Sequence, residues 1–160
     1  MLENRPMDLT TSYPRSPRAT IAGLAMAARA ADKARAHAAG TIGEYNYDCP
    51  MDNKLFAFVG TDGAEFLAAV TSTDDDSGAE HLLAAKVSGK SAEEIAAYNH
   101  SLVEHQPHEG TDGVKWFLAG REKNGHGRTD IFTWTDLIDV EEGRDVAHRS
   151  DTPEWAKSHA

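Results

Sequence analysis

A short loop in the first third of the chain gathers the side chains most able to do chemistry. Tyr45 and Tyr47 supply phenols, and Glu44 supplies a carboxylate. Cys49, the one cysteine of the chain, supplies a thiol. An enzyme could use Glu44 or Asp52 as a general base and a tyrosine as a proton donor or oxyanion stabiliser. A binding protein could use the same groups to line a ligand pocket.

Cys49 on its own is a weak indication of nucleophilic catalysis. A reactive thiolate needs a nearby cation or a helix N-terminus, and the sequence neighbours of this cysteine are Asp48 and Pro50. His37 could act as its base only if the fold brings the two side chains together. We therefore expect Cys49 to be a structural side chain.

Basic side chains are concentrated near the N-terminus. The first 40 residues carry six basic and three acidic side chains, although the whole chain has a formal charge of −10. Such asymmetry either seats an anion on the basic side or lets the two oppositely charged regions pack together, and packing is the simpler alternative. The basic residues that could bind an anion or a partner beside the loop are Arg15, Arg18, Arg29, Lys33 and Arg35.

Three polar residues have a spacing that a metal site could use. His100, Glu104 and His108 would share one helix face if a helix reached that far. Pro107 indicates that the helix ends earlier, because the residue before a proline disfavours helical geometry. A solvated polar face is the expected alternative, and we predict no metal and no cofactor.

Charge and hydropathy exclude several function classes. A charge of −10 disfavours binding to the nucleic-acid backbone. No apolar stretch approaches the roughly 20 residues of a membrane span. A single cysteine fits a reducing compartment. The expectation is a cytoplasmic, acidic interaction module that binds neither nucleic acid nor membrane.

Composition predicts an all-α protein. Much of the hydrophobic share is alanine, whereas aromatic and β-branched residues are sparse. We expect one domain of five to seven short helices over residues 18–142. An extended arm with three prolines precedes it at 1–17, and a loose, charged tail follows at 143–160. Trp155 in this tail either folds back onto its own domain or docks on another subunit, which would make a homo-oligomer.

Helix boundaries follow from capping and stop signals. The strongest helix prediction covers residues 20–39, which end at the natural stop Gly40. Two further helices are expected to begin where Asp62 and Ser91 are each followed three residues later by a glutamate. Thr129 or Asp130 is expected to cap the last helix.

Several ungapped motifs run along most of the chain in a fixed order. They are Asp8-Leu9-Thr10, Pro14-Arg15-Ser16-Pro17-Arg18, Gly23, Asp32-Lys33-Ala34-Arg35-Ala36, Gly40, Gly43-Glu44-Tyr45-x-Tyr47, Cys49-Pro50-x-Asp52, Thr133-Trp134-x-Asp136-Leu137-Ile138-Asp139 and Glu141-Glu142-Gly143-Arg144. Together they resemble a bacterial family known as domain of unknown function 5069. The resemblance implies a small, cytoplasmic, mainly helical protein, and it carries no catalytic or binding residue to this chain.

Three functional hypotheses remain open on the sequence. The leading one is a non-enzymatic helical module that binds a small anionic ligand or a partner through the basic face of the first helix and the Glu44–Cys49 loop. The second is a small enzyme that uses the same pocket. The third is a structural subunit of a homo-oligomer or larger complex.

Overall fold

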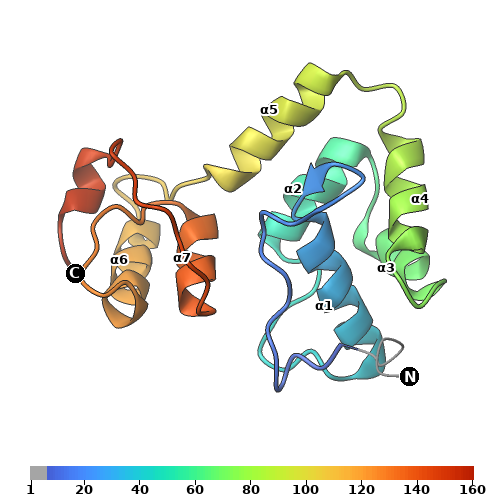
Figure 1. Cartoon of the computed structure of the whole chain (residues 1–160), viewed down its shortest axis with the longest axis horizontal. Coiled ribbons are helices and arrows are strands. Elements are labelled where there is room, and N and C mark those ends of the chain that lie inside the picture. Colours follow the sequence, from blue (N-terminus) through green and yellow to red (C-terminus); the bar gives the residue numbers. More distant parts are fainter. Residues whose placement is uncertain (1–6) are drawn as a thin grey trace. The chain divides into compact units, whose positions relative to one another are not determined.

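The fold is that of a computed structural model, and the structure describes residues 7–160. Residues 1–6 of the predicted N-terminal arm lie outside the described residues. Within the described part, seven α-helices, one 3-10 helix and one two-stranded hairpin make up the regular structure (Figure 1). The predicted class, a mainly α-helical protein with five to seven short helices, is confirmed.

The backbone divides into two compact units, the first ending at Leu102 and the second spanning Val103–Ala160. This boundary falls inside residues 18–142, where the sequence indicated none. The first unit contains β1 (Thr20–Ile21), β2 (Leu24–Ala25), α1 (Ala27–Ala39), α2 (Pro50–Val59), α3 (Gly63–Thr71), α4 (Ser77–Lys86) and nearly all of α5 (Ala92–Val103). The second contains α6 (Asp112–Asn124), α7 (Trp134–Glu141) and the 3-10 helix η2 (Glu154–Lys157).

The alanine-rich helix α1 is the centre of the first unit. It packs against α2, α3 and β1, and Figure 1 shows it in blue beside α3. Six of its alanines are completely buried, namely Ala27, Ala28, Ala30, Ala31, Ala34 and Ala36. Alanine has no side chain beyond Cβ, so neighbouring helices can approach α1 closely from more than one side. The high alanine content therefore both favours the helix and allows other elements to pack closely around it.

The helix predicted over residues 20–39 is wrong at its beginning. The structure starts α1 at Ala27, and residues 20–25 form the antiparallel hairpin β1–β2 instead. Its two turn residues, Ala22 and Gly23, have positive φ angles of 54° and 76°. Such left-handed geometry is incompatible with an α-helix that continues through the turn.

Contacts from α5 explain why the hairpin replaces the helix. The Tyr98 hydroxyl donates to the Ala25 carbonyl oxygen at 2.9 Å. The Asn99 side chain accepts from the Ala25 N–H at 2.8 Å and donates to the Gly23 carbonyl oxygen at 2.9 Å. These partners lie more than seventy residues further along the chain, and they satisfy backbone groups that a helix would pair internally.

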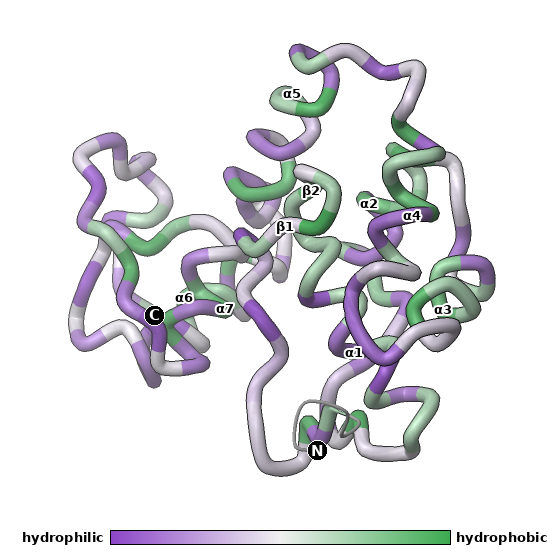
Figure 2. The backbone as a smooth tube through the Cα atoms, turned by 45° about the vertical axis from the view of Figure 1, so that its right-hand side comes forward, coloured by the Kyte–Doolittle hydropathy of each residue, from purple (hydrophilic) through white to green (hydrophobic). Residues whose placement is uncertain are grey.

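Both predicted capping signals are confirmed. The Asp62 carboxylate accepts from the backbone N–H of Glu65 at 2.8 Å, at the start of α3. The Ser91 hydroxyl accepts from the backbone N–H of Glu94 at 3.0 Å, ahead of α5. Figure 2 shows hydrophilic and hydrophobic residues alternating along α5, as expected for a helix with one exposed face.

The described part of the N-terminal arm, residues 7–17, lies against α1. Leu9 is buried, and its N–H donates to the Thr41 carbonyl oxygen at 2.8 Å. The Pro17 carbonyl oxygen accepts from the N–H of Met26 at 2.7 Å. These bonds hold the arm near both ends of the helix.

The second unit has an aromatic core. Phe117, Ile131 and Leu137 are buried together. The rings of Trp134 and Trp155 meet the Phe117 ring edge-on, with centroid distances of 5.1 and 5.5 Å. Of the two alternatives for Trp155, the structure therefore shows the first, in which this side chain folds back onto its own chain.

Residues 143–160 make more contacts than a loose tail would. Arg121 of α6 is 2% exposed, and burial lowers the pKa of its guanidinium. The guanidinium donates to the carbonyl oxygens of Thr129, Ile131, Ala156 and Ser158 at 2.6–3.2 Å. Two of these carbonyls belong to the last five residues, so a buried arginine holds the chain end against α6.

The last helix begins later than predicted. Neither Thr129 nor Asp130 caps it, because the Thr133 hydroxyl accepts from the N–H of Asp136 at 3.1 Å and α7 starts at Trp134. Asp130 instead accepts hydrogen bonds from Arg128 and Arg149.

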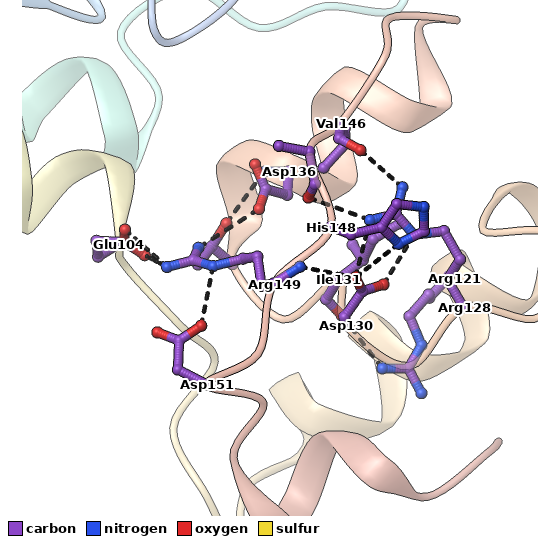
Figure 3. Close-up of polar contacts among 12 residues, drawn as sticks. Glu104, Arg121, Arg128, Asp130, Ile131, Asp136, Val146, His148, Arg149 and Asp151 are labelled. Atoms are coloured by element: carbon purple, nitrogen blue, oxygen red, sulfur yellow. Dashed lines mark hydrogen bonds and ion pairs between the residues drawn. The ribbon is translucent and has the colours of Figure 1, made fainter.

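The Asp130 carboxylate binds three residues (Figure 3). It accepts from the Arg128 guanidinium at 2.8 and 3.1 Å and from the Arg149 backbone N–H at 2.9 Å, and it contacts the His148 ring at 3.0 Å. The hydrogen bond from Arg128 is the largest cause that holds the pKa of Asp130 far below its usual range. These bonds tie residues 146–149 to the segment before α7.

This low pKa predicts acid sensitivity of the second unit. An unfolded aspartate takes up its proton near about pH 4, whereas folded Asp130 does so only at lower pH. Its stabilising contribution is therefore complete above about pH 4 and is lost as the pH falls further toward the folded pKa. Asp130→Asn should be less stable than the wild type near neutral pH and should lose less stability between neutral and acidic pH. Unfolding followed by tryptophan fluorescence at neutral and at acidic pH measures this difference in stability. Asp145→Asn, at an exposed aspartate, is the control.

Candidate functional site

Arg15 is fixed between two carboxylates. Its guanidinium donates to Asp32 at 3.0 Å and to Asp76 at 2.8 and 3.0 Å, and its backbone N–H also donates to Asp32, at 2.8 Å. The bond to Asp76 is the main cause that raises the pKa of Arg15 above its ordinary value and lowers that of Asp76. A ligand anion at Arg15 would have to displace a carboxylate that is already in place.

Lys33 and Asp52 form an ion pair inside the first unit. Lys33 is 3% and Asp52 0% exposed, and the ammonium nitrogen lies 2.9 Å from Oδ2 of the carboxylate. The same ammonium donates to the Asn46 carbonyl oxygen at 3.0 Å and to Sγ of Cys49 at 3.2 Å. One buried cation thus connects α1, the loop and the first turn of α2.

Cys49 occupies the N-cap of α2 and is half-buried. Its backbone N–H donates to Oδ2 of Asp52 at 3.2 Å. The reciprocal half of this capping box directs the backbone N–H of Asp52 toward the Cys49 side chain. The cysteine therefore does have both a cation and a helix N-terminus beside it, which its sequence neighbours did not indicate.

The Asp52 carboxylate is incompletely paired. Oδ2 receives the Lys33 ammonium and the Cys49 N–H, but Oδ1 is buried without a hydrogen-bond partner among the described residues. A buried oxygen without a donor is unusual and costly in a folded protein.

The loop tyrosines have structural contacts. The Tyr47 hydroxyl donates to the Gly63 carbonyl oxygen at 2.6 Å, and burial is the main cause that raises the pKa of this phenol. The Tyr45 ring lies under the Arg29 guanidinium at 5.5 Å. Glu44 is exposed. The loop therefore brings both tyrosines onto the first unit, where the Tyr47 hydroxyl and the Tyr45 ring contact groups of the same chain.

The remaining basic candidates are placed differently from one another. Arg29 is buried and donates to the Arg15 carbonyl oxygen at 3.1 Å. Arg35 donates to the carbonyl oxygens of Thr73 and Asp75 in the acidic segment between α3 and α4. Arg18 is exposed.

These contacts bear on the two interpretations of the uneven charge. Arg15 and Lys33 are paired with Asp76 and Asp52, which lie in the acidic remainder of the chain. Arg35 binds backbone carbonyls of the same acidic segment. The prediction that the oppositely charged regions pack together is therefore confirmed for these residues.

The histidine-containing ladder does not form a metal site. The helix α5 ends at Val103, so His108 does not continue its face. Glu104 binds the Arg149 guanidinium at 2.8 Å instead, as Figure 3 shows. Among residues 7–160, no group of three or more histidine, cysteine, aspartate or glutamate side chains is arranged to hold a metal ion.

A groove of about 570 Å³ lies between α2 and α5. Its lining is mainly apolar, with the Phe58 ring stacked on the Tyr98 ring at 4.5 Å. Lys90 lies with its ammonium 4.6 Å from the centre of the Phe58 ring. The side chains that line the groove are those of Lys54, Ala57, Phe58, Glu94, Ala97, Tyr98, Ser101 and Leu102. Sequence analysis missed this groove because its two walls come from separate helices.

The family comparison covers most of both units. The model of the family described as Domain of unknown function (DUF5069) matches residues 11–144. The chain belongs to this family. The matched DUF5069 region contains the Lys33–Asp52–Cys49 cluster and the α2–α5 groove, and it ends before η2. A search among curated proteins found no match.

Among the described residues of this DUF5069 chain, no helix is both long and apolar enough to cross a bilayer.

Proposed function

We propose that this DUF5069 chain is a non-enzymatic binding module that takes a small anionic ligand with an apolar body in the α2–α5 groove. The proposal keeps the ligand class expected from the sequence but moves the site. An anion on the basic face of α1 would compete with Asp32, Asp52 or Asp76 for its cation. A ligand in the groove would not have to displace these carboxylates. The open groove with its stacked Phe58 and Tyr98 rings is the observation that carries the proposal.

The groove supplies both parts of the recognition. Phe58 and Tyr98, with the neighbouring alanines, offer an apolar surface for a short hydrocarbon or a ring. Lys54 lines one wall, exposed, and supplies a positive charge. Glu94 also lines the groove, but its carboxylate accepts from the backbone N–H of Ser91 at 3.4 Å. A carboxylate on an apolar chain is the ligand class that fits these groups.

Two side chains that an enzyme could use for acid–base catalysis are engaged in structural contacts, which favours a binding role. Asp52, a candidate general base, is held in a buried ion pair with Lys33. Tyr47, a candidate proton donor, donates its hydroxyl hydrogen bond to the Gly63 carbonyl oxygen, and its raised pKa makes it a weaker acid. We further place the protein in the cytoplasm, in keeping with its single thiol, and expect no nucleic-acid or membrane partner.

The proposal is tested with octanoate and octanol, which share an apolar body and differ in charge. Octanoate should bind more tightly than octanol. In an NMR titration with octanoate, the protein amide resonances that shift should belong to α2 and α5. Lys54→Ala should weaken octanoate binding about fivefold, as expected for one partly screened charge, and leave octanol binding unchanged. Ala97→Phe should block both ligands by filling the groove.

Lys123→Ala, at an exposed lysine of the second unit, is the matched control and should bind octanoate like the wild type. Equal affinities for octanoate and octanol would refute the anionic part of the proposal. Shifts that fall on α1 and the Glu44–Cys49 loop would instead return the site to the basic face.

A further inference from the structure

We infer that Cys49 is a hydroperoxide-reactive thiol, activated by the buried Lys33 ammonium and by its position at the N-terminus of α2. This inference adds a redox reaction at the Lys33–Asp52–Cys49 cluster to the binding role proposed above, and it is independent of the α2–α5 groove. It begins from the contact of 3.2 Å between Nζ of Lys33 and Sγ of Cys49. A cation and a helix N-terminus both stabilise a thiolate, and the thiolate is the nucleophilic form of cysteine.

The cluster is more than an isolated cysteine. The Lys33 ammonium contacts the sulfur and the Asp52 carboxylate together, and Asp52 also accepts the backbone N–H of Cys49. These bonds hold the ammonium beside the sulfur in a buried position. Because Asp52 balances its charge, Lys33 acts on the sulfur through the direct N–H contact of 3.2 Å. Cys49 itself is half-buried, so the residue is partly exposed to solvent.

Asp52 Oδ1 gives an independent indication of a small polar reactant. This oxygen is buried and has no hydrogen-bond donor among the described residues. A hydroperoxide, or the S–OH group that it leaves on sulfur, carries the O–H donor that Oδ1 lacks. Oδ1 belongs to the carboxylate whose other oxygen, Oδ2, binds the same Lys33 ammonium as the sulfur.

The reaction is a two-electron oxidation of sulfur. The thiolate of Cys49 attacks the terminal oxygen of the hydroperoxide, an S–O bond forms, and the O–O bond breaks. Sulfur becomes a sulfenic acid that keeps the hydrogen of the transferred oxygen. The leaving alkoxide, or hydroxide for hydrogen peroxide, takes up a proton from water to give an alcohol or water.

Reduction of the sulfenic acid must involve another molecule. The chain has one cysteine, so no second thiol of the same chain can condense with the product. A low-molecular-weight thiol would attack the sulfenic sulfur and release water, giving a mixed disulfide. A second thiol would then attack the sulfur of the first, restoring Cys49 and releasing the two external thiols as a disulfide. The structure therefore assigns this site to a hydroperoxide and an external thiol.

The first test compares the native wild-type protein with the same chain unfolded in urea. At about pH 6 an ordinary thiol is almost entirely protonated. We expect iodoacetamide to alkylate native Cys49 about tenfold faster than the unfolded chain. Dimedone labels sulfenic acids and not oxidised methionines. After treatment with hydrogen peroxide, dimedone labelling should likewise be about tenfold faster for the native protein than for the unfolded chain. A native rate equal to or below the unfolded rate would overturn the inference.

The second test removes the cation while keeping the protein folded. Replacing the ion pair by the double variant Lys33→Met/Asp52→Leu substitutes apolar side chains for both charges, which buried sites often tolerate. Its folded form, verified by circular dichroism, should lose the rate advantage over the unfolded chain. Retention of the fast reaction in this folded variant would show that Lys33 does not activate the thiol. Lys123→Ala, at an exposed lysine of the second unit, leaves the cluster intact and should react like the wild type.

Discussion

Replacing Lys33 by methionine is expected to lower the free energy of unfolding of the first unit by about 3–5 kcal/mol. The change leaves the completely buried Asp52 carboxylate without its cation, and it removes the donors to Asn46 and Cys49. An unpaired charge in the interior is costly, and that cost dominates over the packing that methionine retains. Urea unfolding followed by far-ultraviolet circular dichroism measures the loss.

Two variants make this result specific. Lys33→Met/Asp52→Leu should recover most of the lost stability, because no uncompensated charge remains. Lys86→Met breaks an ion pair with Glu65 in which both side chains are substantially exposed, and its effect should be much smaller. If Lys33→Met and Lys86→Met have equal effects, the buried ion pair does not stabilise the first unit.

The second large effect is expected at Arg121. Arg121→Met should destabilise the second unit by about 3–5 kcal/mol, since it leaves buried carbonyl oxygens without donors. It should also release the chain end, because Ala156 and Ser158 are bound through this guanidinium.

Tryptophan fluorescence is suited to this measurement, as the three tryptophans of the chain, at positions 116, 134 and 155, all belong to the second unit. Arg121→Lys should show a smaller but clear loss, since an ammonium keeps the charge but cannot span four carbonyls as a planar guanidinium does. A wild-type unfolding midpoint for Arg121→Met would show that the tail contacts contribute nothing to stability.

Sequence patterns succeeded where structure is determined locally. Asp62 and Ser91 cap their helices as predicted, because a capping side chain and the N–H that it accepts are three residues apart. The mainly helical class follows for the same reason, since helix propensity is a property of each residue and its near neighbours. The family motifs also required only linear order, and the family match confirms them.

The same patterns failed where distant segments compete with local preference. Residues 20–25 carry an apolar helical stripe, yet Tyr98 and Asn99 of α5 bind the hairpin that they form. The sequence also did not predict that Arg121 holds the C-terminal residues. An arginine is normally exposed, and Arg121 is buried here because carbonyl oxygens such as that of Ala156 accept its hydrogen bonds.

For the candidate site, too, the sequence determined some features and the tertiary structure others. The sequence by itself determined which groups are present: a helix rich in alanine and basic residues, a loop with two tyrosines and one thiol, and an acidic remainder. Only the tertiary structure decided that Lys33 is buried against Asp52 and Cys49, and that Arg15 is held by Asp32 and Asp76. The physical reason is that charge is a property of one residue, whereas the strength of an ion pair and the reactivity of a thiol depend on distance and burial. Both are set by segments that meet only when the chain folds.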